Sequence, residues 1–218
     1  MTFYQQLQQE TAEARQTMLA APAIAACQRG EISVAMYRAF LSQAFYHVSH
    51  TVPLMMAAGS RLPPSREAIR GAIAEYIEEE YGHQQWILND IRACGGDAEA
   101  VRHGKPVLAI ELMIAFLYDQ IQRVNPLSIF GMVQVLEGTS VAIASTVADQ
   151  LQRGLALPEK AMSYLRSHGA LDVEHLAFFE QLMNTISDPQ DQADIIHAAK
   201  VVYQLYGEML RGLTETSS

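Results

Sequence analysis

The sequence predicts an all-α fold, a bundle of seven helices in a single domain spanning residues 1–218. Apolar residues recur at intervals of three and four along most of the chain, and no useful length of it alternates as a β-strand does. Glycine and proline divide these periodic stretches into lengths that suit helices. Half of the 218 residues are hydrophobic, which is enough for one full core, and no segment has the composition of a linker.

The seven helices are placed by their periodicity and by the residues that stop them. They are expected at about Phe3–Leu19, Ser33–Ala58, Ser65–Ala93, Pro106–Asn125, Leu127–Arg153, from Pro158 to the Asp188-Pro189 pair, and from there to Arg211. An alanine-rich turn at Pro22 is expected to end the first helix, and the second begins beyond Gly30. The Pro63-Pro64 pair ends the second, because proline cannot continue a helix. Ser65 is the expected N-cap of the third helix, which stops at Gly95-Gly96.

The last four helices are delimited in the same way. Pro106 opens the fourth, which is mostly apolar, and the Asn125-Pro126 pair ends it. Gly154 ends the fifth helix. Pro158 suits the first turn of the sixth helix, where the missing N–H is no loss, and the Asp188-Pro189 pair separates the sixth helix from the seventh.

Composition excludes several classes of partner. The net charge of −9 argues against binding to nucleic acid or to an anionic membrane surface. The two cysteines, Cys27 and Cys94, form neither a disulfide framework nor a thiolate zinc site. The longest apolar run, 107–118, contains Glu111 and is too short to cross a bilayer, and the polar N-terminus does not resemble a signal peptide. We therefore expect a cytoplasmic protein that has no nucleic-acid or membrane partner.

Three polar residues interrupt the apolar face of the sixth predicted helix: His168, Asp172 and His175. At roughly 100° per residue, their spacings of four and three place them within about 60° of arc on one face. The same face continues in both directions as Ala161, Leu165, Phe179, Leu182 and Ile186. Because imidazoles and carboxylates are costly to bury without partners, we expect a metal ion to satisfy them.

A carboxylate and an imidazole, Glu80 and His83, interrupt the third predicted helix in the same way. The apolar stripe that contains them consists of Ile69, Ile73, Tyr76, Ile87 and Ile91. Glu78 and Glu79 fall off this stripe, and Glu75 shares the outer face with Glu79. We therefore expect Glu80 inside the bundle facing His83, and the other three glutamates on a solvated face.

The fifth and second predicted helices each add a candidate. Glu137 lies at the centre of an apolar stripe that consists of Phe130, Val133, Val141, Ala144 and Ala148. A buried glutamate there suits a metal ligand, or a bond to a backbone group or an arginine. In the second helix, His47 shares a face with Phe40 and Leu54, and His50 lies on an adjacent face. A single histidine on such a face is more often a hydrogen-bonded core residue than a ligand, so both interpretations of His47 stay open.

Together these residues predict a dinuclear metal site inside the bundle. The candidate ligands are His47, Glu80, His83, Glu137, His168, Asp172 and His175. Imidazole and carboxylate ligands without thiolates suit iron or manganese better than structural zinc. Helical bundles build such sites from Glu-x-x-His pairs and single glutamates on facing helices. The carboxylates bridge two metal ions and neutralise their charge, and each histidine binds one ion.

These motifs resemble those of the haem-oxygenase-like di-iron oxidases. The resemblance rests on His168-x-x-x-Asp172-x-x-His175, on Glu137 within VQVLEGTS and on Glu80-x-x-His83, and in the number and order of helices it covers nearly the whole chain. That superfamily, which includes TenA thiaminases, PqqC-type quinone oxidases and haem oxygenases, shares a seven-helix fold. The resemblance implies two bound iron ions, dioxygen as a co-substrate and a homodimer.

The activity that the resemblance implies is that of an oxidase or oxygenase. It would activate dioxygen at a di-iron site and oxidise a small organic substrate of the amino-acid or fatty-acid type, with electrons from a donor that the sequence does not name. A second interpretation is a metal-free ligand-binding protein or cofactor-independent oxidase, similar to TenA and PqqC. A third is a ferritin-like protein that stores or oxidises iron. His168 and the helix count favour the first interpretation.

The chain departs from two relatives at their functional residues. Haem oxygenases need a proximal histidine near their N-terminus, and here no histidine precedes His47, so haem cleavage is not expected. TenA thiaminases use a cysteine nucleophile in the middle of the chain, which neither Cys27 nor Cys94 matches. Cys27 is expected to be a small packing residue and Cys94 a residue at a helix terminus.

A third departure concerns the second helix, from which the di-iron members usually contribute a glutamate. This chain offers only His47 or His50 there. Because a neutral imidazole brings no negative charge, the second iron ion should be held less firmly. We expect one tight site, built from Glu137 and the motif at residues 168–175, and one weak site near Glu80 and His83.

Overall fold

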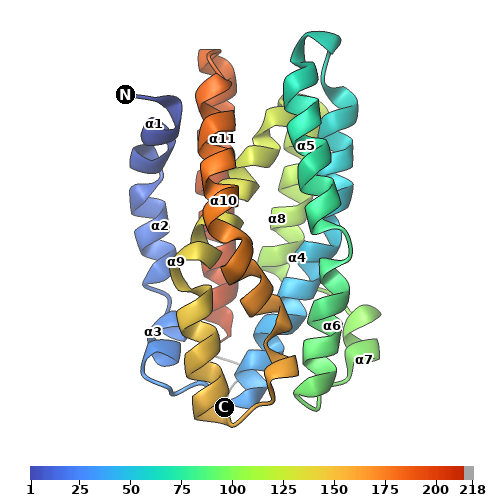
Figure 1. Cartoon of the computed structure of the whole chain (residues 1–218), viewed down its shortest axis with the longest axis vertical. Coiled ribbons are helices and arrows are strands. Elements are labelled where there is room, and N and C mark those ends of the chain that lie inside the picture. The colour runs from blue at the N-terminus through green and yellow to red at the C-terminus, as the bar shows by residue number, and fades with distance from the viewer. Residues whose placement is uncertain (214–218) are drawn as a thin grey trace.

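The helices lie side by side along one long axis (Figure 1). The computed structural model of the chain describes residues 1–213, and the side chains of 1–138, 148–152, 154–166 and 176–213. Within residues 1–213 there is no β-strand, which confirms the predicted all-α class. No helix in the described residues combines the length and the apolar character that crossing a membrane requires.

The chain forms long helices that are joined by short turns. In order, the α-helices are α1 (Phe3–Glu10), α2 (Ala12–Leu19), α3 (Pro22–Gln28), α4 (Val34–Arg61), α5 (Glu67–Glu80), α6 (His83–Ala93), α7 (Ala98–Arg102), α8 (Leu108–Asp119), α9 (Ile129–Leu155), α10 (Ser163–Thr185) and α11 (Pro189–Gly212). The connecting turns include the 3₁₀ segments η1 (Pro64–Arg66), η3 (Pro126–Ser128) and η4 (Glu159–Ala161) and the π segment η2 (Gln120–Val124).

Two predicted boundaries near the N-terminus are wrong. The first predicted helix is divided into α1 and α2 at Thr11, whose buried hydroxyl donates a hydrogen bond to the carbonyl oxygen of Leu7 at 2.7 Å. The segment predicted as a turn at Pro22 is the helix α3, because proline fits the first turn of a helix. By contrast, α4 runs through Pro53 without interruption.

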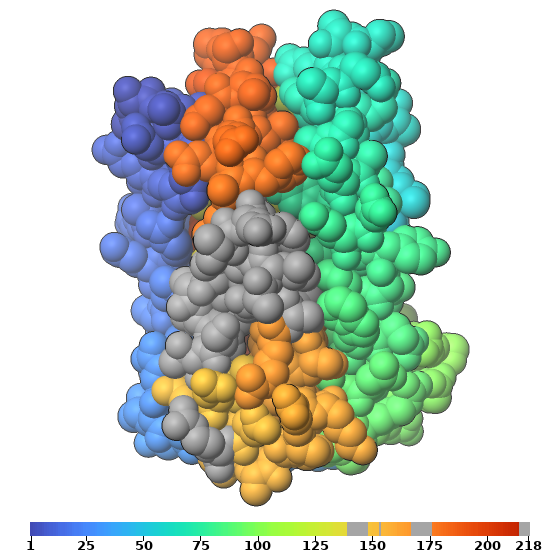
Figure 2. All heavy atoms as spheres, in the orientation of Figure 1, coloured from blue at the N-terminus to red at the C-terminus, as the bar shows by residue number. Residues whose placement is uncertain are grey.

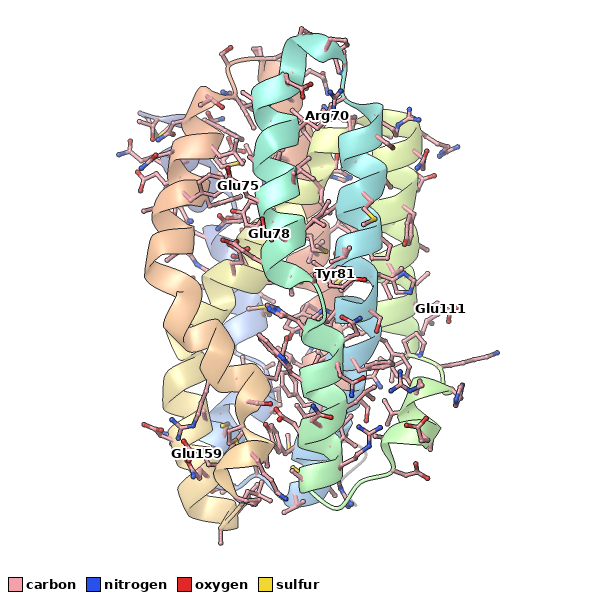
Figure 3. All side chains as sticks on the ribbon, turned by 45° about the vertical axis from the view of Figure 1, so that its right-hand side comes forward. Arg70, Glu75, Glu78, Tyr81, Glu111 and Glu159 are labelled. Carbon is pink, nitrogen blue, oxygen red and sulfur yellow. The ribbon has the colours of Figure 1, made fainter. Side chains whose placement is uncertain are left out.

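The third predicted helix is in fact two helices, α5 and α6. Between them Tyr81 is extended and Gly82 has a φ of 93°, a left-handed conformation that only glycine adopts at little cost. Figure 3 labels Tyr81 at this break, where its side chain is exposed. Ser65 is not the N-cap of this segment, since it lies in the 3₁₀ turn η1 and α5 begins at Glu67 without a side-chain cap.

Packing between distant segments sets the order of the helices in the bundle. α10 packs against α9, α11 packs against α9, α2 and α8, and α4 packs against α5 and α6. In Figures 1 and 2, α1 and α2 form one edge of the visible face, and α5 and α6 are stacked end to end along the opposite edge.

Two apolar clusters make up the described core. Among the buried apolar side chains of α5 and α6, one cluster ends at Tyr76 and the other begins at Ile87. Glu80 and His83 lie in sequence between these two residues, so polar side chains occupy the place where these helices pass from one cluster to the other.

Candidate metal centre

A cavity of about 160 Å³ lies inside the bundle, between α3, α4, α9, α10 and α11 and the end of α5. Most of its lining is aliphatic or aromatic, with side chains such as Ile24, Met36, Met132, Leu136 and Leu210. Three of the predicted ligands border it: His47 from α4, Glu80 from α5 and Glu137 from α9. No arginine or lysine lines it in the described part of the chain.

The break between α5 and α6 places Glu80 and His83 against each other. The Nδ1 atom of His83 lies 3.1 Å from Oε2 of Glu80, and their side chains are only 4% and 13% exposed, respectively. The His83 ring also stacks on Trp86, with 4.1 Å between the ring centroids. These contacts orient the imidazole, as outer-shell groups do for metal-binding histidines.

The exposure of the glutamates on α5 confirms the prediction that Glu80 is the buried one. Glu75, Glu78 and Glu79 are exposed, whereas Glu80 is largely buried. Glu75 and Glu78 are labelled on α5 above the break in Figure 3. The predicted burial of Glu80 and His83 is therefore correct, although the continuous helix from which it was argued is interrupted at Gly82.

The two histidines of α4 have different surroundings. His47 is 2% exposed, borders the cavity and meets the ring of Tyr206 edge-on, with 5.6 Å between the ring centroids. His50 is half-buried and does not line the cavity, and its Nδ1 atom lies 3.1 Å from the hydroxyl of Tyr118. Burial lowers the pKa of His50. Of the two, His47 is the one that reaches the cavity, as its helical position predicts.

Glu137 is partly buried on α9 and borders the same cavity, while Phe130 and Val133 of its stripe are buried. The side chains of His168, Asp172 and His175 lie outside the described residues. Among the side chains that are described, no three potential ligands come close enough together to hold a metal ion.

Two buried tyrosines that line the cavity beside the candidate ligands were missed by the sequence analysis. Tyr164 and Tyr206 both line the cavity, and burial raises the pKa of each well above its ordinary value. The negative charges of Tyr206 and Glu80 add to the rise for Tyr164, and all three residues line the same cavity. A tyrosine in an apolar stripe is usually a core residue, so the sequence carried little signal for this role.

The buried Asp90 on α6 was also missed. Its carboxylate accepts hydrogen bonds from the backbone N–H groups of Ser163 at 3.2 Å and Tyr164 at 2.9 Å, and from the Ser163 hydroxyl. It therefore satisfies the first N–H groups of α10, the helix that contains the predicted 168–175 motif. The contact joins residues more than seventy positions apart, which helical periodicity does not detect.

Neither cysteine has the surroundings of a reactive thiolate. Both are buried and free of disulfides, and Cys27 lines the cavity. Burial raises the pKa of Cys27, and burial together with the charge of Asp90 raises that of Cys94 to about 11. Both thiols are therefore protonated near neutral pH. Cys27 is a buried packing residue and Cys94 is the C-cap of α6, as predicted.

The described donors fit iron in their chemistry. Two carboxylates and one imidazole face a single enclosed space, and the one thiol beside them is protonated. Carboxylate and imidazole ligands suit iron and manganese, whereas structural zinc sites commonly use thiolates. Two carboxylates also supply the negative charge that a pair of divalent ions needs.

The sequence and the structure both resemble known proteins. Residues 38–207 match a protein family described as "Iron-containing redox enzyme". A comparison of the sequence with curated proteins found no match.

Several solved structures share the fold. A domain of unknown function with a haem-oxygenase-like fold from Shewanella denitrificans aligns with a TM-score of 0.86 at 22% identity, covering 98% of this chain and 92% of that one. A TenA homologue from Pseudomonas syringae aligns at 0.82 and 15% identity, with 98% and 93% covered. Haem oxygenase from Leptospira interrogans aligns at 0.77 and 16% identity, with 97% and 100% covered. At these identities, the likeness shows the fold alone.

Proposed function

Since the chain belongs to the iron-containing redox enzymes with the haem-oxygenase-like fold, we propose that it is a non-haem iron oxidase or oxygenase with a di-iron site. One observation carries the proposal: His47, Glu80 and Glu137, from three different helices, border a single buried cavity. Helical bundles build dinuclear metal centres from carboxylates and imidazoles that different helices contribute to one interior space.

The residues of the chain have distinct roles in this proposal. Glu80 and Glu137 would hold the iron ions and neutralise their charge, with His47, His83 and the motif at 168–175 supplying the remaining ligands. The iron pair, when bound, supplies the activation of dioxygen. The Glu80 carboxylate and the Trp86 ring orient the His83 imidazole, and the apolar walls exclude water from the reacting groups.

The lining of the cavity favours one part of the expected substrate range. An amino acid would bring an ammonium and a carboxylate group into a space that no described arginine or lysine lines. An aliphatic chain would instead bury its methylene groups against side chains such as Ile24, Met36 and Leu210, at about 0.8 kcal/mol for each group. We therefore propose a substrate of the fatty-acid type, whose chain lies along the apolar walls.

A direct test uses the single tryptophan of the chain. Trp86 stacks on His83, so an iron ion bound at His83 should quench its fluorescence. Anaerobic titration of the protein with ferrous iron should quench the emission and yield a metal content near two ions per chain by elemental analysis. Glu80→Gln should weaken the quenching, whereas Glu75→Gln on the exposed face of the same helix should not. If the protein binds no iron, or if both variants behave alike, the proposal is wrong.

A metal-free ligand-binding protein, or a cofactor-independent oxidase, is the alternative. It is favoured by the contact between Glu80 and His83, which pairs two polar groups without a metal, and by the fold shared with a TenA homologue. In that case the protein would bind no iron and an apolar carboxylic acid would still enter the cavity. The iron titration therefore separates the two functions.

A further inference from the structure

A second cavity, of about 190 Å³, lies between α1, α2, α9, α10 and α11. It shares no described lining residue with the cavity of the candidate metal centre. Its polar lining consists of Tyr4, Gln8, Arg15, Gln134 and Tyr203. No aspartate or glutamate lines it among the described residues, so the one charge in its described walls is positive.

Arg15 is the only charged residue in the described lining of this cavity. Its side chain is partly buried, and its guanidinium donates a hydrogen bond to Oε1 of Gln8. The Nε2 atom of Gln8 in turn donates to Oε1 of Gln134 at 3.2 Å, and Gln134 is 2% exposed. No described carboxylate lies within ion-pair distance of Arg15. A partly buried guanidinium that lacks a counter-ion is an unfavourable arrangement unless a ligand supplies one.

The buried hydroxyl of Tyr203 is a second polar group at this site, since the residue lines the cavity and is 1% exposed. Burial raises the pKa of Tyr203, and interactions of the hydroxyl with the side chains of Gln134 and Arg15 partly oppose that rise. The geometry of these interactions falls short of a full hydrogen bond. The hydroxyl and the guanidinium therefore lie near each other in one cavity, which is the arrangement expected of a preformed site.

We propose that this second cavity binds a small monocarboxylate, held by the guanidinium of Arg15 and the hydroxyl of Tyr203. A planar guanidinium matches the two oxygens of a carboxylate, and one positive charge balances one negative charge. A dianion such as phosphate would keep one unbalanced negative charge, because Arg15 is the only charged residue in the described lining. This inference does not depend on iron binding.

The test is a calorimetric titration of the full chain with acetate, with acetamide as the neutral ligand of the same shape and with inorganic phosphate as the dianion. Acetate should bind, and acetamide and phosphate should bind far more weakly. Arg15→Met should lower the affinity for acetate roughly tenfold or more, since hydrogen bonds to charged groups contribute about 1.5–3 kcal/mol. Arg29→Met, at an exposed arginine that does not line this cavity, should leave it unchanged.

Tyr203→Phe is a second variant, which tests the site even if Arg15→Met loses binding because it misfolds. It removes one oxygen atom whose described contacts fall short of full hydrogen-bond geometry, so the melting temperature should change little while acetate binding weakens. The proposal is overturned if the wild type does not bind acetate, or if acetamide or phosphate binds as tightly. It is also overturned if Arg15→Met or Tyr203→Phe binds acetate as the wild type does.

Discussion

The Nδ1 atom of His83 lies 3.1 Å from Oε2 of Glu80, across a break between two helices. The left-handed conformation of Gly82 allows this contact, because it lies between the end of α5 and the start of α6 at His83. Two groups that would share one turn in a continuous helix thus meet at a corner of the backbone. The geometry of the candidate centre therefore depends on a residue that carries no side chain.

Gly82→Ala should destabilise the fold by about 1–2 kcal/mol, which is the usual cost of a left-handed conformation for a residue with a Cβ atom. No atom lies within 4 Å of the added methyl group, so the cost comes from the backbone alone. Urea denaturation measures the change in the free energy of unfolding.

Gly71→Ala is the matched control, since Gly71 lies inside α5 and its added methyl group also meets open space. A helical glycine is less stable than alanine, so this variant should be more stable by about 0.5–1 kcal/mol. Equal effects of the two substitutions would contradict the role given to Gly82.

Asp90→Ala should lower the free energy of unfolding by about 1–3 kcal/mol, because the N–H groups of Ser163 and Tyr164 would lose their acceptor. Chemical denaturation at neutral pH measures this change. Asp97→Ala removes a capping carboxylate that is exposed at the start of α7, and water can replace it. The loss should therefore be smaller at Asp97 than at Asp90.

The stability of the protein should also depend on pH through Asp90. Burial raises the pKa of its carboxyl group above the ordinary value of 3.8, and the hydrogen bonds from Ser163 and Tyr164 oppose this rise only in part. Because the pKa is raised in the folded state, protonation of Asp90 favours the folded protein. This contribution to stability is complete below the unfolded-state pKa and is lost as the pH rises through the folded-state pKa. From pH 3 upward, the wild type should lose stability relative to Asp90→Asn. Parallel pH profiles of the two proteins would refute this.

His47→Glu should tighten the weaker of two unequal iron sites by about tenfold, as expected if the added charge contributes about 1.4 kcal/mol. The new carboxylate would enter the cavity that Glu80 and Glu137 border. Anaerobic iron titration measures both affinities. His50→Glu is the control, because His50 does not line the cavity and should leave both affinities unchanged. Two equal tight sites in the wild type would contradict this prediction.

Replacing His168, Asp172 or His175 with alanine should lower iron affinity by more than roughly tenfold, since even outer-shell partners of a metal contribute that much. Elemental analysis of the purified variants measures the bound iron, and circular dichroism checks that helicity is retained. His103→Ala, at a histidine whose side chain is 77% exposed, is the control. Unchanged iron content in all three variants would remove this motif from the ligand set.

The sequence alone predicted which side chains of each helix are buried. Glu80 and His83 lie inside while Glu75, Glu78 and Glu79 lie outside, and His47 rather than His50 reaches the cavity. These assignments follow from the helical repeat and the polarity of neighbouring residues, which are local properties of the chain. The all-α class follows from the same pattern, taken over the whole length.

Only the tertiary structure showed how the helices meet. It revealed the corner at Gly82 and the cavity that α4, α5 and α9 share. It also revealed the cap that Asp90 provides for α10 and the second cavity beside Arg15. The helical repeat does not indicate that the helix breaks at Gly82. It also does not indicate that Asp90 contacts Ser163, which lies far away in the sequence. These features depend on backbone conformation and on contacts between segments far apart in sequence, which a pattern of nearby residues does not encode.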